Sequence, residues 1–237
     1  YHGPKRLKKI AKKIHALTTK LSEGLNQLGY TQINQNYFDT IHVNINDVNI
    51  DTLKIFALDS KINFNYIDDK NLTISIDEKD DIENINDILQ VFAKSCNHAD
   101  PEKLIKNLLQ GNYLEADSFI PKTLYRESKY MQHEVFNTYH SETEMMRYIK
   151  SLENKDLSLN HSMIPLGSCT MKLNAASELF PLSWSEFGNL HPFVPINQAR
   201  GYQIMFHELE ESLCEITGFS GVSLQPNSGA QGEYSGL

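Results

Sequence analysis

Residues 223–237 read Ser-Leu-Gln-Pro-Asn-Ser-Gly-Ala-Gln-Gly-Glu-Tyr-Ser-Gly-Leu. Pro226 cannot donate to a β-ladder and ends a short apolar run at residues 222–224. The following residues, 227–232, combine two glycines with a small residue at which a helix can start. Such a turn leaves backbone N–H groups unpaired and pointing outward, where the helix dipole adds positive potential. The stretch is typical of a phosphate site that needs no Lys or Arg, and an ordinary capped turn is the alternative.

A second motif lies at residues 161–172, which read His-Ser-Met-Ile-Pro-Leu-Gly-Ser-Cys-Thr-Met-Lys. Ser168 and Thr170 supply hydroxyls beside the exposed backbone of Gly167, as a small carboxylate or a thiol-bearing substrate requires. A structural turn of Gly and small residues is the alternative. Cys169 has no His fixed beside it in the sequence, so we interpret it as a packed thiol rather than a nucleophile.

These motifs resemble a known family, and the match is long and ungapped within each motif. Residues 161–174 and 225–237 are similar to motifs of the P protein of the glycine cleavage system, the pyridoxal-phosphate-dependent glycine decarboxylase. The opening Tyr1-His2-Gly3-Pro4, followed by a helix, resembles a segment deep inside that family's chain. The resemblance therefore implies a fragment from the junction of the family's two pyridoxal-enzyme-like halves.

The resemblance also implies a fold and a domain plan. We expect an α/β fold with an α+β part, belonging to a pyridoxal-phosphate enzyme of fold type I. Residues 1–111 would form the small α+β domain of the first half, and residues 112–140 a connector. Residues 141–237 would begin the large domain of the second, cofactor-binding half.

The implied chemistry is decarboxylation of glycine and transfer of the aminomethyl group to the lipoyl arm of the carrier H protein. Pyridoxal 5′-phosphate would act as the electron sink for the carbanion, because no side chain can stabilise it. Lys172 does not match the family's Schiff-base lysine, which we expect beyond Leu237, so the isolated chain is predicted to be inactive. The resemblance implies no metal. The predicted phosphate ligands are Ser228, Gly229, Ala230 and Gln231, and the predicted edge of the substrate site is Ser168, Cys169 and Thr170.

Two other functions compete with this one. Another fold-type-I enzyme, such as a cysteine desulfurase or an aminotransferase, shares this type of phosphate cradle but leaves residues 164–172 unexplained. A non-catalytic structural or oligomerisation module is the second alternative. The favoured interpretation implies glycine, the lipoylated H protein and a second copy of the full-length chain as partners. It also implies the cytoplasm of a bacterium, or the mitochondrial matrix of a eukaryote.

Composition limits the classes of function. The chain has 22 Lys and Arg residues against 30 Asp and Glu, a formal net charge of −8, which argues against a general nucleic-acid or anionic-membrane surface. Cys96, Cys169 and Cys214 share no metal-like spacing, and an odd number suits a reducing compartment. No apolar run approaches the ~20 residues of a membrane span.

Hydrophobic periodicity predicts the local structure. Pro4 and Gly29 bound a helix over residues 4–28, and a Ser141–Glu144 capping box opens another helix. The order of helices and strands before residue 96 predicts a small layer with a mixed or antiparallel sheet. The predicted strands are 37–43, 62–67 and 72–76. Besides residues 4–28, the predicted helices are 51–60, 82–95, 101–111, 141–152, 173–184 and 201–217.

The first helix is unusually basic. Its first 20 residues carry seven Lys or Arg and no acid. A membrane or nucleic-acid helix is one interpretation. We favour the other, a helix with one face on a core and a solvated basic face.

Overall fold

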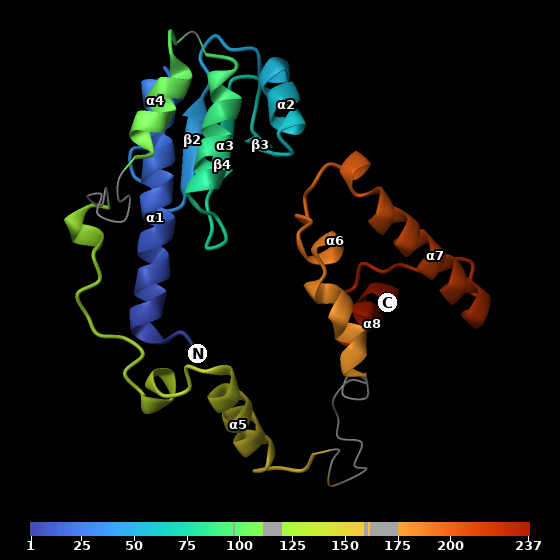
Figure 1. Ribbon diagram of the computed structural model, residues 1–237. Helices are drawn as coiled ribbons and strands as arrows, with labels where there is room; N and C mark the ends of the chain where they lie inside the picture. The colour runs from blue at the N-terminus through green and yellow to red at the C-terminus, as the bar shows by residue number, and fades with distance from the viewer. Residues whose placement is uncertain (97, 111–119, 159–160, 162–174) are drawn as a thin grey trace. The chain divides into compact units, whose positions relative to one another are not determined.

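The computed structural model describes residues 1–96, 98–110, 120–158, 161 and 175–237 (Figure 1). Two compact units divide the chain, the first from Tyr1 to Asp156 and the second from Leu157 to Leu237. This division rests on compactness. The assignment of segments to two halves of a longer enzyme stays a prediction.

The first unit is built on a four-stranded antiparallel sheet in the order β1-β2-β4-β3. The predicted strands 62–67 and 72–76 are observed as the antiparallel pair β3 and β4, and the sheet is antiparallel throughout the described residues rather than mixed. The strands are β1 (Thr31–Gln32), β2 (Thr40–Asn44), β3 (Asn65–Tyr66) and β4 (Asn71–Ser75), and the helices are α1 (Gly3–Gln27), α2 (Ile50–Asp59), α3 (Ile82–Ala93) and α4 (Pro101–Leu108).

The two faces of the sheet differ in polarity. Alternate residues of β2 and β4 are buried in one core with side chains of all four helices. On the opposite face the Thr40 and Ser75 hydroxyls lie 2.8 Å apart, and Asn44 donates to Asn71 at 2.9 Å. The strands therefore bury one face and satisfy the other with polar pairs. The largest fully buried side chains are Phe92, Leu17, Leu21, Leu25, Ile41, Ile45, Leu53, Leu72, Ile85, Leu89, Ile105 and Val43.

Helix ends follow the predicted chemistry. Asp81 caps α3 through a capping box. Its side chain accepts a hydrogen bond from the Asn84 backbone N–H, and the Asn84 side-chain oxygen accepts one from the Asp81 backbone N–H. Gly29 lies just past α1 with a φ of 96°, a conformation that favours glycine. The predicted end of the first helix at Gly29 is therefore confirmed.

The described part of the predicted connector contacts α1. The Tyr130 hydroxyl donates to the Pro4 carbonyl at 2.9 Å, and the His140 ring donates to the Tyr1 carbonyl at 2.6 Å. Gly3 has a φ of 65°, and a Cβ there would meet the Phe136 carbonyl oxygen at 2.7 Å, so no larger residue fits. The described elements of this segment are η2 (Lys122–Leu124) and η3 (Glu134–Asn137), and α5 (Glu142–Glu153) follows it.

The second unit is helical, and none of its described residues is buried. The predicted helix over 201–217 is confirmed as α7, which ends at Gly218 in the left-handed conformation with a φ of 73°. The predicted helix over 173–184 is a 3₁₀ helix, η5, in its described part, because Pro181 lacks the N–H that an α-helix needs. The elements are η5 (Ala176–Ser183), α6 (Ser185–Gly188), η6 (Ile196–Gln198), α7 (Arg200–Thr217) and α8 (Gly229–Gly236).

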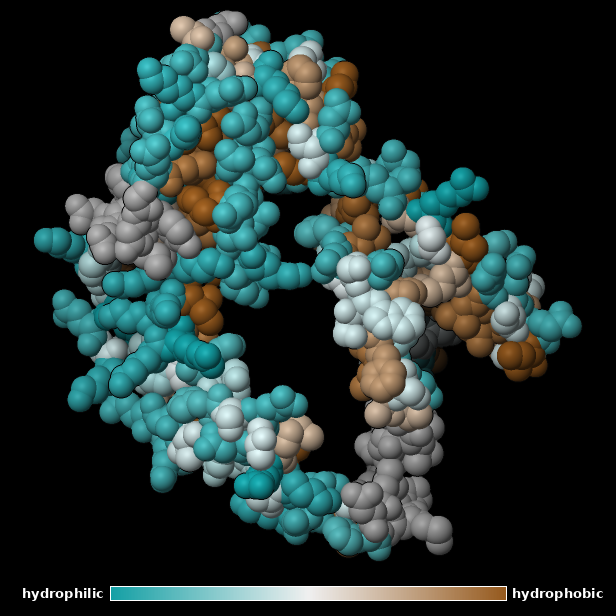
Figure 2. Space-filling view, in the orientation of Figure 1, coloured by the Kyte–Doolittle hydropathy of each residue, from teal (hydrophilic) through white to brown (hydrophobic). Residues whose placement is uncertain are grey.

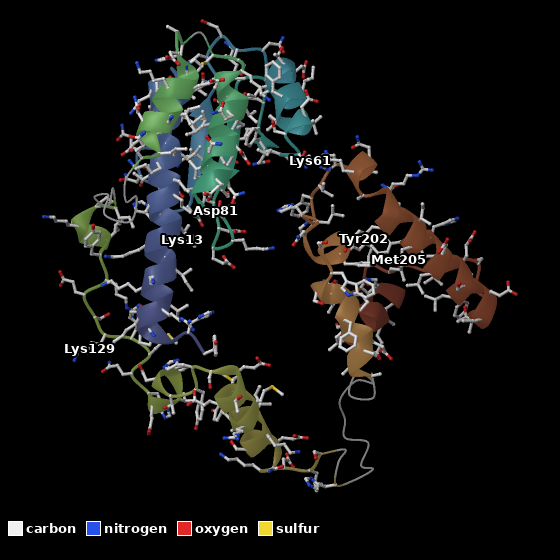
Figure 3. All side chains as sticks on the ribbon, in the orientation of Figure 1. Lys13, Lys61, Asp81, Lys129, Tyr202 and Met205 are labelled. Carbon is white, nitrogen blue, oxygen red and sulfur yellow. The ribbon has the colours of Figure 1, made fainter. Side chains whose placement is uncertain are left out.

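The exposed apolar side chains of this unit form a clear surface feature. Brown, hydrophobic residues lie along α7 in Figure 2. Tyr202, at the start of α7, is half-buried, and its hydroxyl donates to the Phe187 carbonyl at 2.9 Å (Figure 3). Phe206 and Leu209, further along the same helix, are each 46% exposed. A helix whose apolar stripe lies this open requires further protein to cover it.

Candidate cofactor site at the start of α8

Ser228 occupies the N-cap of α8 in an extended conformation, with φ −155° and ψ 164°. Its Oγ accepts a hydrogen bond from the Gln231 backbone N–H at 3.3 Å. The Gly232 N–H donates to the Ser228 carbonyl at 2.9 Å and closes the first helical turn. Since Oγ acts as the acceptor in the cap, the hydroxyl hydrogen of Ser228 is available to an outside acceptor.

Gln231 closes the cap from the other side. Its Oε1 accepts from the Asn227 backbone N–H at 2.7 Å. This bond sets the orientation of the amide, because the carbonyl oxygen is engaged and the Nε2 group carries the two free donors. The donor that the sequence predicted for Gln231 is therefore left available by the local geometry.

Gly229 and Ala230 begin the helix, so their N–H groups have no acceptor one turn earlier. A Cβ placed on Gly229 would meet no heavy atom within 4 Å in the described part of the chain. Gly229 has no positive φ, in contrast to Gly3, Gly29 and Gly218. Gly229 therefore needs no left-handed conformation here, and the open space beside it is what its missing side chain contributes.

The four residues fit a phosphate group. Two backbone N–H groups, one hydroxyl and one amide can converge on an anion at the positive end of a helix dipole. All four are exposed in this chain. Their chemistry suits the phosphate of the predicted pyridoxal 5′-phosphate, and the assignment of this cofactor stays a prediction.

Other predicted site residues are placed only in part. Ser168, Cys169, Thr170 and Lys172 lie outside the described residues. His191 Nδ1 accepts from the Phe193 N–H at 3.0 Å, so this ring serves its own loop. The predicted substrate edge remains a prediction.

Sequence reasoning did not find two hollows on the molecule. In the first unit a cavity of about 630 Å³ lies where the loop after α1 meets the start of α2, and its lining includes Tyr30, Asn49 and Cys96. In the second unit an open hollow of about 850 Å³ flanks the C-terminal end of α7 and includes Cys214. The first is lined by residues far apart in the sequence, from Gln27 to His98, so no motif signals it. The second is lined by residues 207–222, and no chemical motif in that stretch signals it. The described residues contain no group of His, Cys, Asp and Glu arranged to hold a metal. None of the described helices has the length and apolarity to cross a membrane.

Comparison with known proteins gives the class first. A family model described as "Glycine cleavage system P-protein" matches residues 1–92. That stretch contains α1, the whole antiparallel sheet and most of α3.

Relatives extend the match to the rest of the chain. The sequence is 54% identical over 239 aligned residues to "Glycine dehydrogenase (decarboxylating)" of Christiangramia forsetii, and 48% identical to the protein of that name in Nostoc sp.. It is also 48% identical to "Glycine dehydrogenase (decarboxylating), mitochondrial" of Mus musculus. The alignments cover 100% of this chain, and 24%, 24% and 22% of the three relatives. Residues 1–92 match the family model, the whole chain is similar to these relatives, and it spans about a quarter of their length.

Proposed function

We propose that this chain is part of a pyridoxal-phosphate-dependent glycine dehydrogenase of fold type I. The full-length protein decarboxylates glycine and transfers the aminomethyl group to the lipoyl arm of the carrier H protein. One observation carries the proposal, namely that close to half of all 237 residues are identical to relatives named glycine dehydrogenase (decarboxylating). The phosphate-fitting helix start of α8 supports the choice of cofactor.

Residues of this chain hold the cofactor phosphate. The Gly229 and Ala230 N–H groups, the Ser228 hydroxyl and the Gln231 Nε2 group donate to it. Each hydrogen bond to a charged acceptor is worth about 1.5–3 kcal/mol. Bound in this way, the cofactor supplies an electron sink for the carbanion that loss of carbon dioxide creates. The protein's part at this end is to fix the position and orientation of the cofactor against the substrate.

The remaining parts of the site are assigned by resemblance. Ser168, Cys169 and Thr170 form the edge of the glycine site, and the Schiff-base lysine follows Leu237 in the full-length protein. The predicted homo-oligomer and the exposed apolar stripe of α7 agree with a unit that is completed by further protein.

The test uses the full-length protein that the gene encodes. We expect glycine-dependent exchange of labelled bicarbonate when pyridoxal phosphate and lipoylated H protein are present, and no exchange without the carrier. Release of sulfide from cysteine is measured in parallel, because a cysteine desulfurase is the competing enzyme. A folded, cofactor-loaded protein that desulfurates cysteine and does not exchange bicarbonate with glycine would overturn the proposal.

A further inference from the structure

Part of the predicted connector has an unusual backbone shape, and we call this part, residues 130–140, the strap. Met131 has a φ of 51°, a left-handed conformation that residues with a side chain rarely adopt. The Asn137 amide holds this bend, because its Nδ2 donates to the Met131 and His133 carbonyls at 3.0 Å each. Strained residues persist only where their surroundings fix them, and they cluster at the working parts of a protein. The bend at Met131 therefore points to a role for the strap.

Hydrogen bonds fasten both ends of the strap to the chain at the start of α1 (Figure 1). At one end the Tyr130 hydroxyl donates to the Pro4 carbonyl at 2.9 Å. At the other end the His140 ring donates to the Tyr1 carbonyl at 2.6 Å. Both acceptors are backbone carbonyls, so the attachment depends on the path of the chain at the start of α1 rather than on the side chains there.

Gly3 marks the place where the strap and α1 approach most closely. Its φ of 65° is left-handed, and a Cβ there would lie 2.7 Å from the Phe136 carbonyl oxygen and 3.1 Å from Cε1 of His140. A backbone oxygen cannot rotate away as a side chain can, so an alanine at this position would push the strap off the helix. The missing side chain of Gly3 is what allows the strap to lie against α1.

The strap leads directly into α5. The His140 backbone N–H donates to Oε2 of Glu144 at 3.2 Å, and the Ser141 side chain caps the helix by accepting from the Glu144 N–H. The Tyr139 ring stacks on the Tyr148 ring of α5, with centroids 4.2 Å apart. No residue of α5 is buried by the part of the chain that the structure describes. The start of α5 is therefore held by the end of the strap and not by a core.

We infer that the strap is an internal tie that fixes the start of α5 to the start of α1, with Gly3 as the notch that admits it. The predicted domain plan makes residues 112–140 a connector and begins the second half at residue 141. The tie instead makes α5 an extension of the first unit, in agreement with a compact unit that runs to Asp156. A flexible joint between the two predicted halves then belongs after α5. This inference does not depend on the reaction that the full-length protein catalyses.

The test is amide hydrogen exchange, followed by mass spectrometry, on the full-length protein. Gly3→Ala is compared with Gly29→Ala, just past the other end of α1. Both glycines have a positive φ, so alanine strains the backbone at both, but a Cβ on Gly29 meets no heavy atom within 4 Å in the described part of the chain. Tyr130→Phe removes one anchoring hydroxyl and is compared with Tyr125→Phe, earlier in the same connector. Exchange in β2 and β4 shows that each variant folds.

In Gly3→Ala we expect the amides of residues 130–144 to exchange about tenfold or more faster than in the parent, and in Tyr130→Phe about fivefold faster, with β2 and β4 unchanged. Both control variants should stay within about twofold of the parent at these residues. Parent-like exchange in both test variants overturns the tie, and so does faster exchange that is confined to residues 130–139. If Gly3→Ala also loosens β2 and β4, parent-like exchange in Tyr130→Phe overturns the inference.

Discussion

The Tyr30 hydroxyl donates a 2.8 Å hydrogen bond to the backbone carbonyl of Phe92, and the two rings meet edge to face with centroids 4.9 Å apart. The contact joins the segment after α1 to the last turn of α3, across 62 residues of sequence. Both side chains are buried in the core of the first unit. This pair ties the two principal helices of the unit together at one end.

Replacing Tyr30 by Phe tests the strength of that tie. We expect the free energy of unfolding to fall by about 1 kcal/mol, the low end of the loss that follows when a buried hydrogen-bond partner is removed. The loss is limited because the Phe92 carbonyl also accepts from the Ser95 backbone N–H at 3.1 Å and is not left unpaired. Urea unfolding measures the change. Tyr234→Phe, at a position that is 81% exposed, is the control and should leave stability unchanged.

Because the Tyr30 phenol is buried, we predict that the protein loses stability at alkaline pH. Burial raises the pKa of Tyr30 from 10.0 to about 12, and burial likewise raises the pKa of Tyr66 to about 12. The folded state therefore favours the neutral phenols, so their contribution is fully present below pH 10 and is lost as the pH rises from 10 to 12. Unfolding free energies measured across this range should fall, and less steeply in Tyr30→Phe. Equal slopes in parent and variant would contradict this prediction.

Gly24→Ala tests the packing of three helices. A Cβ on Gly24 of α1 would lie 2.6 Å from Leu89 of α3 and 2.8 Å from Leu108 of α4. We expect a net destabilisation of about 1–2 kcal/mol, because overpacking of a buried contact exceeds the helix-propensity gain of up to about 1 kcal/mol. Gly201→Ala is the matched control, since a Cβ there meets nothing within 4 Å. A thermal melt in which Gly24→Ala is as stable as the parent would refute the prediction.

The α8 start is tested by three substitutions in the full-length protein. Gly229→Val should weaken binding of pyridoxal phosphate most, because its side chain fills the open space beside the helix start. Ser228→Ala should cost about 1.5–3 kcal/mol of cofactor binding. Ser228→Asp keeps a good N-cap but removes the donor and adds negative charge, so it should stay folded and still bind poorly. Binding is measured by the absorbance of the bound cofactor. Parent-like affinity in a folded Gly229→Val protein would show that the cofactor phosphate binds elsewhere.

The 237-residue chain on its own should be inactive. No lysine follows Lys172, and the described residues of the second unit bury no side chain. We expect no glycine–bicarbonate exchange from the purified chain supplied with pyridoxal phosphate and lipoylated H protein. The full-length protein assayed alongside is the positive control. Measurable exchange by the 237-residue chain would mean that the cofactor lysine lies within it.

Some strand boundaries were beyond sequence reasoning. The predicted strand over 37–43 is observed at Thr40–Asn44. Tyr37 and Phe38 are β-formers, yet their rings lie 5.6 and 5.9 Å from the His15 ring, and the Phe38 carbonyl accepts from His15 Nδ1. A contact with α1 thus takes them out of the strand. The strand β1 was missed because two residues carry no periodicity.

The sequence by itself determined the local elements, the family resemblance and the candidate phosphate loop. Apolar spacing defined α1 and α7, Ser141 marked a helix start, and the loop at Ser228 carried its donors within four residues. These features depend on neighbours within one or two turns of the chain. The tertiary structure alone decided that Gly24 of α1 faces α3 and α4, that Tyr30 reaches Phe92 and that, apart from Gly3, the buried residues of α1 begin at His15. Burial and long-range contact depend on segments that are distant in sequence, so no local pattern contains them.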